Sequence, residues 1–349
     1  MAELNAMNIL NTIRDNLATT YAERVPKATA DNIAEVGKAI TSDDITTNEF
    51  VNALINKVAL SNVRSKMFKN PLEILKGTNI PMGANIEEIF INPSVSTGYS
   101  EDGAHLLKTT KPDGKVCYYG MSRQDRYPIT INEDMLNRAF HSEQEFMSMY
   151  NAIVTSMYSG DQIDEFLLAK KVIGKSIDNG AMLVVDVDAT KPKEVSKSIS
   201  NISKSFQFPT TSYCGYNLVN KDKISANKEK GCITFCPADN QCLMIRADMQ
   251  TEIDYEVLAT MFHMEVAKLE AITVLVDDIP SEKYDCYAVL CDREAVQMRD
   301  VVFKTTSNYN GSNLEWNFWL HHWEFIFLSM FGNACAFGKK KTVTEPTTK

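Results

Sequence analysis

The chain has 349 residues, with 36 basic and 45 acidic side chains and a formal net charge of −9. This length provides ample core for one large or two ordinary domains. The acidic balance argues against a protein whose main task is to neutralise nucleic-acid phosphates. The start of the chain lacks a secretory signal, and no run of about eighteen apolar residues occurs. We therefore expect a soluble protein, made in a cytosol, with no membrane partner.

The first 60 residues predict two short amphipathic helices. One apolar stripe runs over Leu4–Leu17 and a second over Phe50–Val58. Thr46 and Glu49 have the spacing of a capping box in front of the second stripe. Two such helices cannot bury their own faces alone, so this arm must pack on something else. Its partner is either the body of its own subunit or a neighbouring subunit.

An extended arm is predicted next. Ile86–Ile91 has the composition of a strand, and a polar tip follows from Ser94 to Gly114. The chain returns through Val116 and Tyr118 and then through the alternating apolar residues of 127–131, a period-two strand pattern. We interpret these segments as one long two-stranded hairpin. Because an isolated hairpin is marginal in water, contact with another surface is expected to stabilise it.

Four charged residues on this arm are candidates for a subunit interface. Glu87 and Glu88 lie on the outgoing strand, and Arg123 and Arg126 lie on the return strand. The arginines are expected to pair with the glutamates across a subunit boundary. A solvated charged face is the alternative interpretation.

The longest predicted element is a helix from Ser142 to Asn179. Ser142 and Glu145 form a capping box, and apolar residues recur at spacings of three and four up to Ile177. Asn179-Gly180 supplies a left-handed stop. A continuous helix of this length spans about 57 Å, which suits the spine of an extended subunit. A break at Gly160 is the alternative.

The second half of the chain predicts a mixed α/β domain, because strands and helices interleave. A helix is expected from Thr190 to Phe206, a loop over 210–230 and a second helix near Asp254–Met264. The expected strands are Ala181–Val187, Cys232–Phe235, Cys242–Arg246, Ile272–Val276, Ala288–Leu290 and Val301–Phe303. Alternating aromatic residues from Trp316 to Phe327 favour a sheet, and Thr342–Lys349 has the composition of a disordered tail.

No residues form a convincing reactive site. Cys232, Cys236, Cys242 and His263 lack the paired ligand spacing of zinc sites. The eight cysteines contain no CxxC pair and are expected to be free, buried thiols. The adjacent histidines at 321–322 face opposite sides of a strand, as do Glu87 and Glu88, so neither pair chelates or shares a proton. Phosphate-binding and nucleophile motifs are absent. The sequence therefore predicts no catalytic, cofactor-binding or metal site.

Several segments, in order along the chain, resemble the major capsid proteins of phi29-like podophages. The resemblance covers about residues 25–338. It rests on Val25-Pro26 to Gly37, Asn70-Pro71-Leu72 to Ile89, Arg123-Gln124 to Ala139-Phe140, Asp254 to Met264, and Trp316-Asn317 to Ala336-Phe337. The loop tip at 94–115 and the segment at 210–230 match poorly, which leaves their contacts open.

The resemblance implies an α+β protein with the HK97-like phage capsid fold. The implied parts are an N-terminal arm (1–65), a peripheral-domain entry (66–83), an extended β-hairpin loop (84–132), a peripheral domain with the spine helix (133–180), an axial α/β domain (181–305), a return to the peripheral sheet (306–338) and a disordered tail (339–349). The immunoglobulin-like domain that some members append is not expected here.

The resemblance also implies partners. Copies of the chain would form the hexamers and pentamers of an icosahedral or prolate head in the virion, assembled in the host bacterial cytoplasm. A separate scaffolding protein, a portal at one vertex and double-stranded DNA bound non-specifically on the inner face are implied as well. Crosslinking and proteolytic trimming are not expected. The alternatives are a collar or tail component, which would form small rings, and a cytosolic metal-dependent enzyme.

Overall fold

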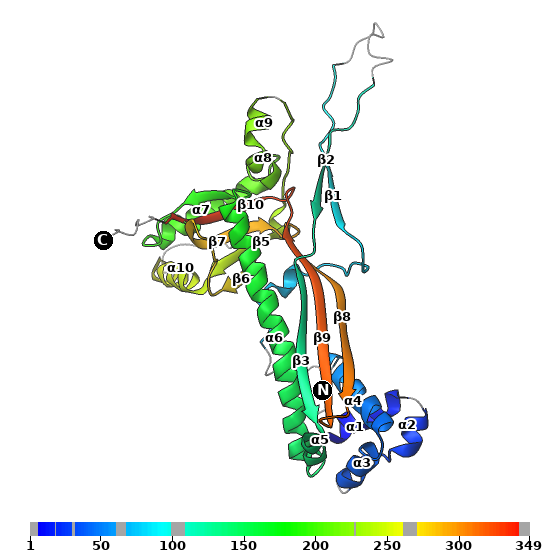
Figure 1. The fold of residues 1–349 in the computed structure, drawn as a ribbon. Helices are drawn as coiled ribbons and strands as arrows, with labels where there is room; N and C mark the ends of the chain where they lie inside the picture. The colour runs from blue at the N-terminus through cyan, green and yellow to red at the C-terminus, as the bar shows by residue number, and fades with distance from the viewer. Residues whose placement is uncertain are drawn as a thin grey trace, which may run out of the picture. The chain divides into compact units, whose positions relative to one another are not determined.

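The structure, a computed structural model, describes residues 6–17, 19–29, 32–60, 68–98, 109–226, 228–260 and 271–341. The chain forms two compact units (Figure 1). Unit 1 comprises Met1–Asn70, Arg123–Glu165 and Asp300–Glu324. Unit 2 comprises Pro71–Ser122, Phe166–Arg299 and Phe325–Lys349. No helix in the described part of the chain is both long and apolar enough to span a membrane.

Unit 1 combines a group of helices with a three-stranded sheet in the order β3-β9-β8. Its helices are α1 (Ala6–Asn16), α2 (Thr19–Arg24), α3 (Ile33–Ile40), α4 (Asp44–Leu60), α5 (Glu133–Ala139) and the first part of α6 (Glu143–Asp178); its strands are β3 (Arg123–Asn132) and most of β8 (Val296–Asn310) and β9 (Glu315–Leu328).

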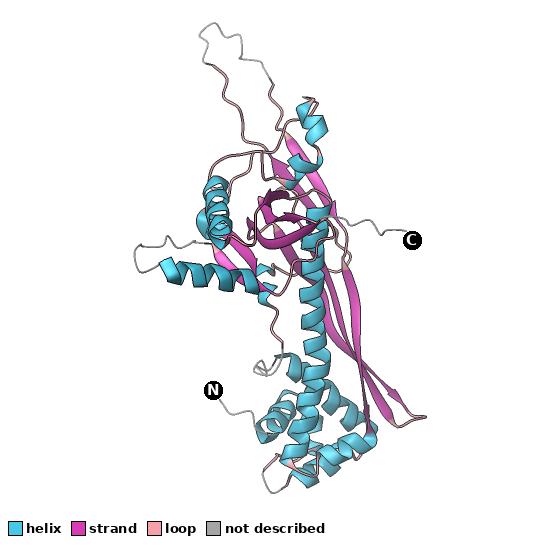
Figure 2. Cartoon of the chain, turned by 90° about the vertical axis from the view of Figure 1, so that its left-hand side faces the viewer, coloured by secondary structure: helices cyan, strands magenta, loops and turns pink. Residues whose placement is uncertain are grey.

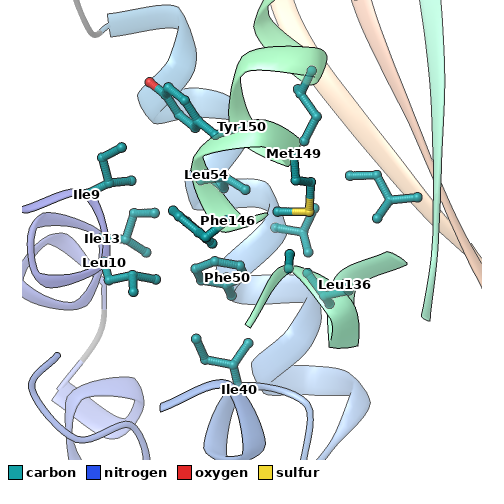
Figure 3. Packing of buried hydrophobic residues seen from close by; sticks show 14 of the residues in the cluster. Ile9, Leu10, Ile13, Ile40, Phe50, Leu54, Leu136, Phe146, Met149 and Tyr150 are labelled. Carbon is teal, nitrogen blue, oxygen red and sulfur yellow. The ribbon is translucent and has the colours of Figure 1, made fainter. Parts of the chain in front are cut away.

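The N-terminal helices pack on their own chain. Phe50 of α4 lies against Phe140 and against Phe146 of α6, with ring centroids 5.6 and 6.4 Å apart. Apolar side chains of α1, α3, α5 and α6 complete this core, as Figure 3 shows. The sequence left two partners open for the arm, its own subunit or a neighbour. In the structure the arm packs on the body of its own subunit. The opposite wall of the core is the apolar face of β9.

The predicted start of the second N-terminal helix is wrong. Helix α4 begins at Asp44, so Thr46 and Glu49 lie inside it. The capping carboxylate is Asp43, whose Oδ1 accepts a hydrogen bond from the Thr46 N–H at 2.7 Å. A carboxylate at a helix start satisfies free N–H groups and opposes the positive end of the helix dipole.

The long predicted helix is confirmed as continuous, because α6 runs through Gly160 without a break. The N–H of Glu145 donates to Ser142 Oγ at 3.2 Å, as a capping box requires. At the other end Gly180 has φ +74° and the N–H of Ala181 reaches the Ser176 carbonyl at 2.9 Å, which closes the helix in the expected left-handed stop. Two residues assigned to its apolar stripe, Ile163 and Leu167, are exposed instead.

Unit 2 is built on a mixed five-stranded sheet in the order β4-β10-β7-β5-β6. The strands are β4 (Leu183–Asp186), β5 (Gln241–Arg246), β6 (Ile272–Val276), β7 (Tyr284–Asp292) and β10 (Ala334–Lys340), joined by helices α7 (Pro192–Phe206), α8 (Gly215–Val219), α9 (Lys221–Ser225) and α10 (Ala247–Thr260) and by short 3-10 turns at Pro71–Leu75 and Ala238–Asn240.

Both faces of this sheet are covered, which the period-two alternation of its strands requires. On β5, Cys242 and Met244 pack with the C-terminal part of α6, while Leu243 and Ile245 pack with α7 and α10. Figure 2 shows these helices around the sheet. Unit 2 is therefore a three-layer α/β structure, as the interleaved pattern predicted.

Several predicted elements of the second half have different bounds. The segment at 210–230 contains the helices α8 and α9 rather than only a loop. Cys232–Phe235 forms a single bridge, Thr210 to Thr234, instead of a strand. Helix α10 begins at Ala247, and β10 extends to Lys340. The predicted tail at 342–349 lies outside the described residues.

The long hairpin is shorter than predicted. Strand β1 (Ile86–Ile91) pairs antiparallel with β2 (Gly114–Tyr119), from Ile86 opposite Tyr119 to Ile91 opposite Gly114. The second half of the predicted return strand, β3, instead pairs with β9 of unit 1. The tip at 99–108 lies outside the described residues. The predicted alternation is thus correct, but it belongs to two different sheets.

Candidate functional site: hairpin carboxylates and a buried charge cluster

The four interface candidates lie in two different surroundings. Glu87 and Glu88 are on β1 in unit 2, and Arg123 and Arg126 are on β3 in unit 1. Arg126 and Glu87 are exposed, whereas Arg123 is buried. Whether these side chains contact a neighbouring subunit stays a prediction. The structure gives three of them partners within the chain.

The inward face of the β1–β2 hairpin is fixed to unit 2 by polar and aromatic contacts. Glu88 accepts hydrogen bonds from Tyr119 Oη at 2.7 Å and from Ser329 Oγ at 2.6 Å. The Tyr119 ring stacks on Phe327 with centroids 4.0 Å apart, and burial together with the Glu88 contact raises the pKa of Tyr119. Phe90 stacks on Phe331 at 5.3 Å. The hairpin base is therefore held in place by its own subunit.

The outward face of the same hairpin is apolar and exposed. Ile89 is 61% exposed, Ile91 60%, Val116 43% and Tyr118 72%. Ile89 and Val116 are direct cross-strand partners, and Tyr118 Oη donates to the opposite Glu87 at 3.1 Å. An exposed apolar surface of this kind is typical of an interaction site.

Arg123 organises a buried charge cluster in unit 1. Its guanidinium donates to Asp161 Oδ1 at 2.6 Å and to Glu324 Oε1 at 2.7 Å, and all three side chains are at most 1% exposed. It also binds Asp125 and Tyr127 at the edge of the cluster. Burial alone lowers the pKa of Arg123, but the two buried carboxylates outweigh it and raise that pKa, so the guanidinium is permanently charged.

His322 lies in the same cluster, with a carboxylate on each ring nitrogen. Nδ1 is 2.7 Å from Asp161 Oδ1 and Nε2 is 3.0 Å from Asp300 Oδ1. Burial lowers the pKa of His322, yet the contacts with Asp161 and Asp300 raise it to about 9. For the Glu324 carboxyl, burial raises the pKa, because it disfavours the ionised form. As predicted, the neighbouring His321 points the other way, where its Nε2 meets Thr306 Oγ1 at 2.8 Å.

Two sets of residues in the described part of the chain could hold a metal ion, and they share His322. One is Asp161, Glu165 and His322; the other is Asp300, His322 and Glu324. The cysteines considered from the sequence do not converge on one another: Cys232 lies against Cys214, and Cys242 faces Cys291 across β5 and β7. His263 lies outside the described residues. All eight cysteines are free, as predicted, and seven are buried.

Sequence reasoning missed this cluster, although a signal for it exists. The residues of β9 alternate in burial, with Trp316, Phe318 and Leu320 facing the core. Continuing this alternation beyond Leu320 places His322 and Glu324 on the buried face. A buried histidine and glutamate on one strand face require charged partners, which come from β3, α6 and β8.

Comparison with known proteins agrees with the sequence resemblance. A family model described as "Phi29-like phage major capsid protein" matches residues 10–338. The chain belongs to this family.

Relatives of the chain are major capsid proteins. That of Bacillus phage PZA is 28% identical, over 97% of this chain and 74% of the relative. That of Bacillus phage B103 is 29% identical, over 95% of this chain and 72% of the relative. The capsid protein of Streptococcus phage Cp-1 is 24% identical, with 95% of this chain and 93% of the relative covered. The chain is therefore a structural protein of the phage shell, and neither the enzyme nor the collar alternative is supported.

Solved structures confirm the fold class. A chain in the capsid structure of Staphylococcus phage Andhra superposes with a TM-score of 0.59 at 13% identity, over 78% of this chain and 85% of that chain. A chain in the structure of the head fibre and inner core protein of bacteriophage P68 superposes with a TM-score of 0.57 at 13% identity, over 80% of this chain and 86% of that chain. The α+β architecture is the HK97-like fold of tailed-phage capsids.

Proposed function

We propose that copies of this chain assemble, in the host bacterial cytoplasm, into the hexamers and pentamers of a closed icosahedral or prolate head around double-stranded DNA. A separate scaffolding protein and a portal at one vertex take part in this assembly. The DNA contact is non-specific, which suits a chain with a formal net charge of −9.

In this proposal the chain is divided as the resemblance implies. Residues 1–65 are the N-terminal arm, 66–83 the entry, 84–132 the extended loop, 133–180 the peripheral domain with its spine helix, 181–305 the axial domain, 306–338 the return to the peripheral sheet and 339–349 the tail. Within that scheme the exposed charges of Glu87 and Arg126 belong to the contacts between subunits.

The observation that carries the proposal is the two-sided hairpin β1–β2. One face is fixed to its own subunit through Glu88 and Tyr119. The other presents Ile89, Ile91 and Val116 to solvent. A hairpin that is anchored on one side and apolar on the other is suited to cover a neighbouring copy, because burying these side chains there contributes about 25 cal/mol for each Å² removed from water.

The substitution Ile89→Asp tests this role. A carboxylate at the centre of the outward face opposes burial against a neighbour, so we expect at least a tenfold loss of assembled shells in sedimentation analysis. Because Ile89 is 61% exposed, the unfolding free energy of the subunit should change by about 1 kcal/mol or less.

Ile89→Val is the matched control, since it keeps an apolar β-branched residue at the same position. Shells should form with this variant at the wild-type level. Normal shell formation by Ile89→Asp would contradict the assigned role of the hairpin face.

A further inference from the structure

Unit 1 contains a buried group of acidic side chains around one imidazole. Asp300 is on β8, whereas His322 and Glu324 lie two residues apart on the buried face of β9. The Nε2 atom of His322 is 3.0 Å from Asp300 Oδ1 and 3.7 Å from Glu324 Oε2. The three potential ligand atoms lie within 4.8 Å of one another. Three nitrogen and oxygen ligands around one zinc ion, each about 2.1 Å from it, lie at comparable separations.

One carboxylate oxygen of this group is buried without a hydrogen bond to any described residue. Glu324 is fully buried, and its Oε1 accepts a hydrogen bond from Arg123 at 2.7 Å. Its Oε2 has no hydrogen-bond donor among the described residues. A buried carboxylate oxygen without a donor costs about 1–3 kcal/mol or more. Oε2 faces His322 Nε2, so a cation held between these two atoms would satisfy both.

The other side of the imidazole has the arrangement that metal-binding histidines usually show. Asp161 Oδ1 lies 2.7 Å from Nδ1 and is itself held by Arg123 at 2.6 Å. A carboxylate in this position holds a proton on Nδ1 and orients Nε2 toward Asp300 and Glu324, where a metal ion can take the place of the Nε2 proton. Asp161 therefore acts as the positioning residue, and its pairing with Arg123 keeps it away from the cation.

The charges of the group also favour a dication. Asp161, Glu165, Asp300 and Glu324 carry four negative charges when ionised, and Arg123 supplies one positive charge. Three negative charges remain in a region where Glu165, His322 and Glu324 are fully buried. A divalent ion neutralises two of these charges, whereas a single imidazolium neutralises one. The side chain of Asp300, 15% exposed, gives the ion a route from solvent.

We propose that His322 Nε2, Asp300 and Glu324 bind a divalent transition-metal ion of the zinc class. Binding replaces the proton on Nε2, which is released to solvent. The ion joins β8 to β9 and stabilises unit 1. An imidazole ligand favours zinc over magnesium, calcium and manganese, which are better suited to oxygen ligands.

The test uses the purified full-length chain, stripped of metal with a chelator and then dialysed against Zn²⁺, Mn²⁺, Mg²⁺ or Ca²⁺. Bound metal is counted by elemental mass spectrometry after gel filtration, and Co²⁺ is added separately to follow its visible absorption. We expect one Zn²⁺ per chain and a Co²⁺ spectrum with nitrogen ligation. Glu324→Gln and His322→Gln should each weaken binding at least tenfold.

His321→Gln is the matched control, because His321 lies next to His322 but faces Thr306. It should bind metal as the wild type does. The folded wild type also provides a measurement that needs no variant: saturating Zn²⁺ should raise the midpoint of its urea unfolding. Absence of bound metal in the folded wild type, equal binding by His322→Gln, or equally tight binding of Mg²⁺ and Ca²⁺ would each overturn the proposal.

Discussion

Replacing Gly174 by alanine is expected to destabilise unit 2 by about 3 kcal/mol or more. Gly174 lies in α6, and a Cβ there would overlap the backbone carbonyl of Pro280. A backbone carbonyl cannot rotate away as a side chain can, so the segment at 277–283 would have to move away from α6. The segment would then lose its contacts with two charged residues of α6, Lys170 and Asp178.

These contacts are extensive, which explains the size of the expected effect. Lys170 Nζ binds both Asp277 and Asp278. The carboxylate of Asp178 accepts hydrogen bonds from Ser281 Oγ at 2.6 Å and from the N–H groups of Glu282 and Lys283 at 2.9 and 3.1 Å. Burial works against ionisation of Asp178, but the Ser281 and backbone hydrogen bonds lower its pKa, so it remains charged.

Hydrogen exchange measured by mass spectrometry locates the effect. Gly174→Ala should accelerate exchange in β6 and β7, at 272–292, while unit 1 remains protected. Gly160→Ala is the matched control in the same helix, because its Cβ would meet only the Tyr127 ring at 3.6 Å. That change should be neutral or stabilise by up to about 1 kcal/mol. Equal protection in the two variants would show that the close approach of Pro280 has no energetic importance.

The second large effect is expected from Arg123→Met. Removing the guanidinium leaves Glu324 Oε1 without its closest cation, and leaves Asp161 Oδ1 with His322 alone. Breaking such a pair from one side costs about 3–5 kcal/mol, because the remaining charges stay desolvated. Unit 1 should therefore unfold at lower urea concentration. All three tryptophans of the chain lie at 316–323 within unit 1, so tryptophan fluorescence reports this transition directly.

Arg126→Met provides the comparison, because Arg126 lies on the same strand but is exposed. The unfolding midpoint of Arg126→Met should indicate a change in unfolding free energy of about 0.5 kcal/mol or less. A reduced yield of shells from Arg126→Met with unchanged subunit stability would support its predicted place at a subunit interface. Equal destabilisation by the two substitutions would contradict the assignment of Arg123 to the buried cluster.

Local patterns predicted the elements whose stability is local. The helix α6 follows from its cap at Ser142, its three-and-four spacing and the stop at Gly180, all of which involve neighbouring residues. The strand at Ile86–Ile91 and the buried strands of unit 2 follow from composition in the same way. The resemblance to phage capsid proteins then supplied the fold that these local patterns do not specify.

Features that depend on distant partners were not predicted. Alternation showed that the segment at 127–131 is a strand. A period of two carries no information about which strand it pairs with. The partner, β9, lies almost 200 positions further along the chain. The charge cluster brings together Arg123, Asp161, Asp300 and His322 from four elements. The period of β9 indicates that His322 is buried, but Arg123, Asp161 and Asp300 each look like an ordinary surface charge in their own segments. The partners of His322 are therefore visible only in the folded chain.

The most direct test of the central claim is electron microscopy of the full chain, expressed alone and together with a candidate scaffolding protein. The proposed function predicts closed shells, tubes or sheets with hexagonal order in at least one of the two preparations. Monodisperse small rings or monomers under both conditions would contradict self-assembly into a shell.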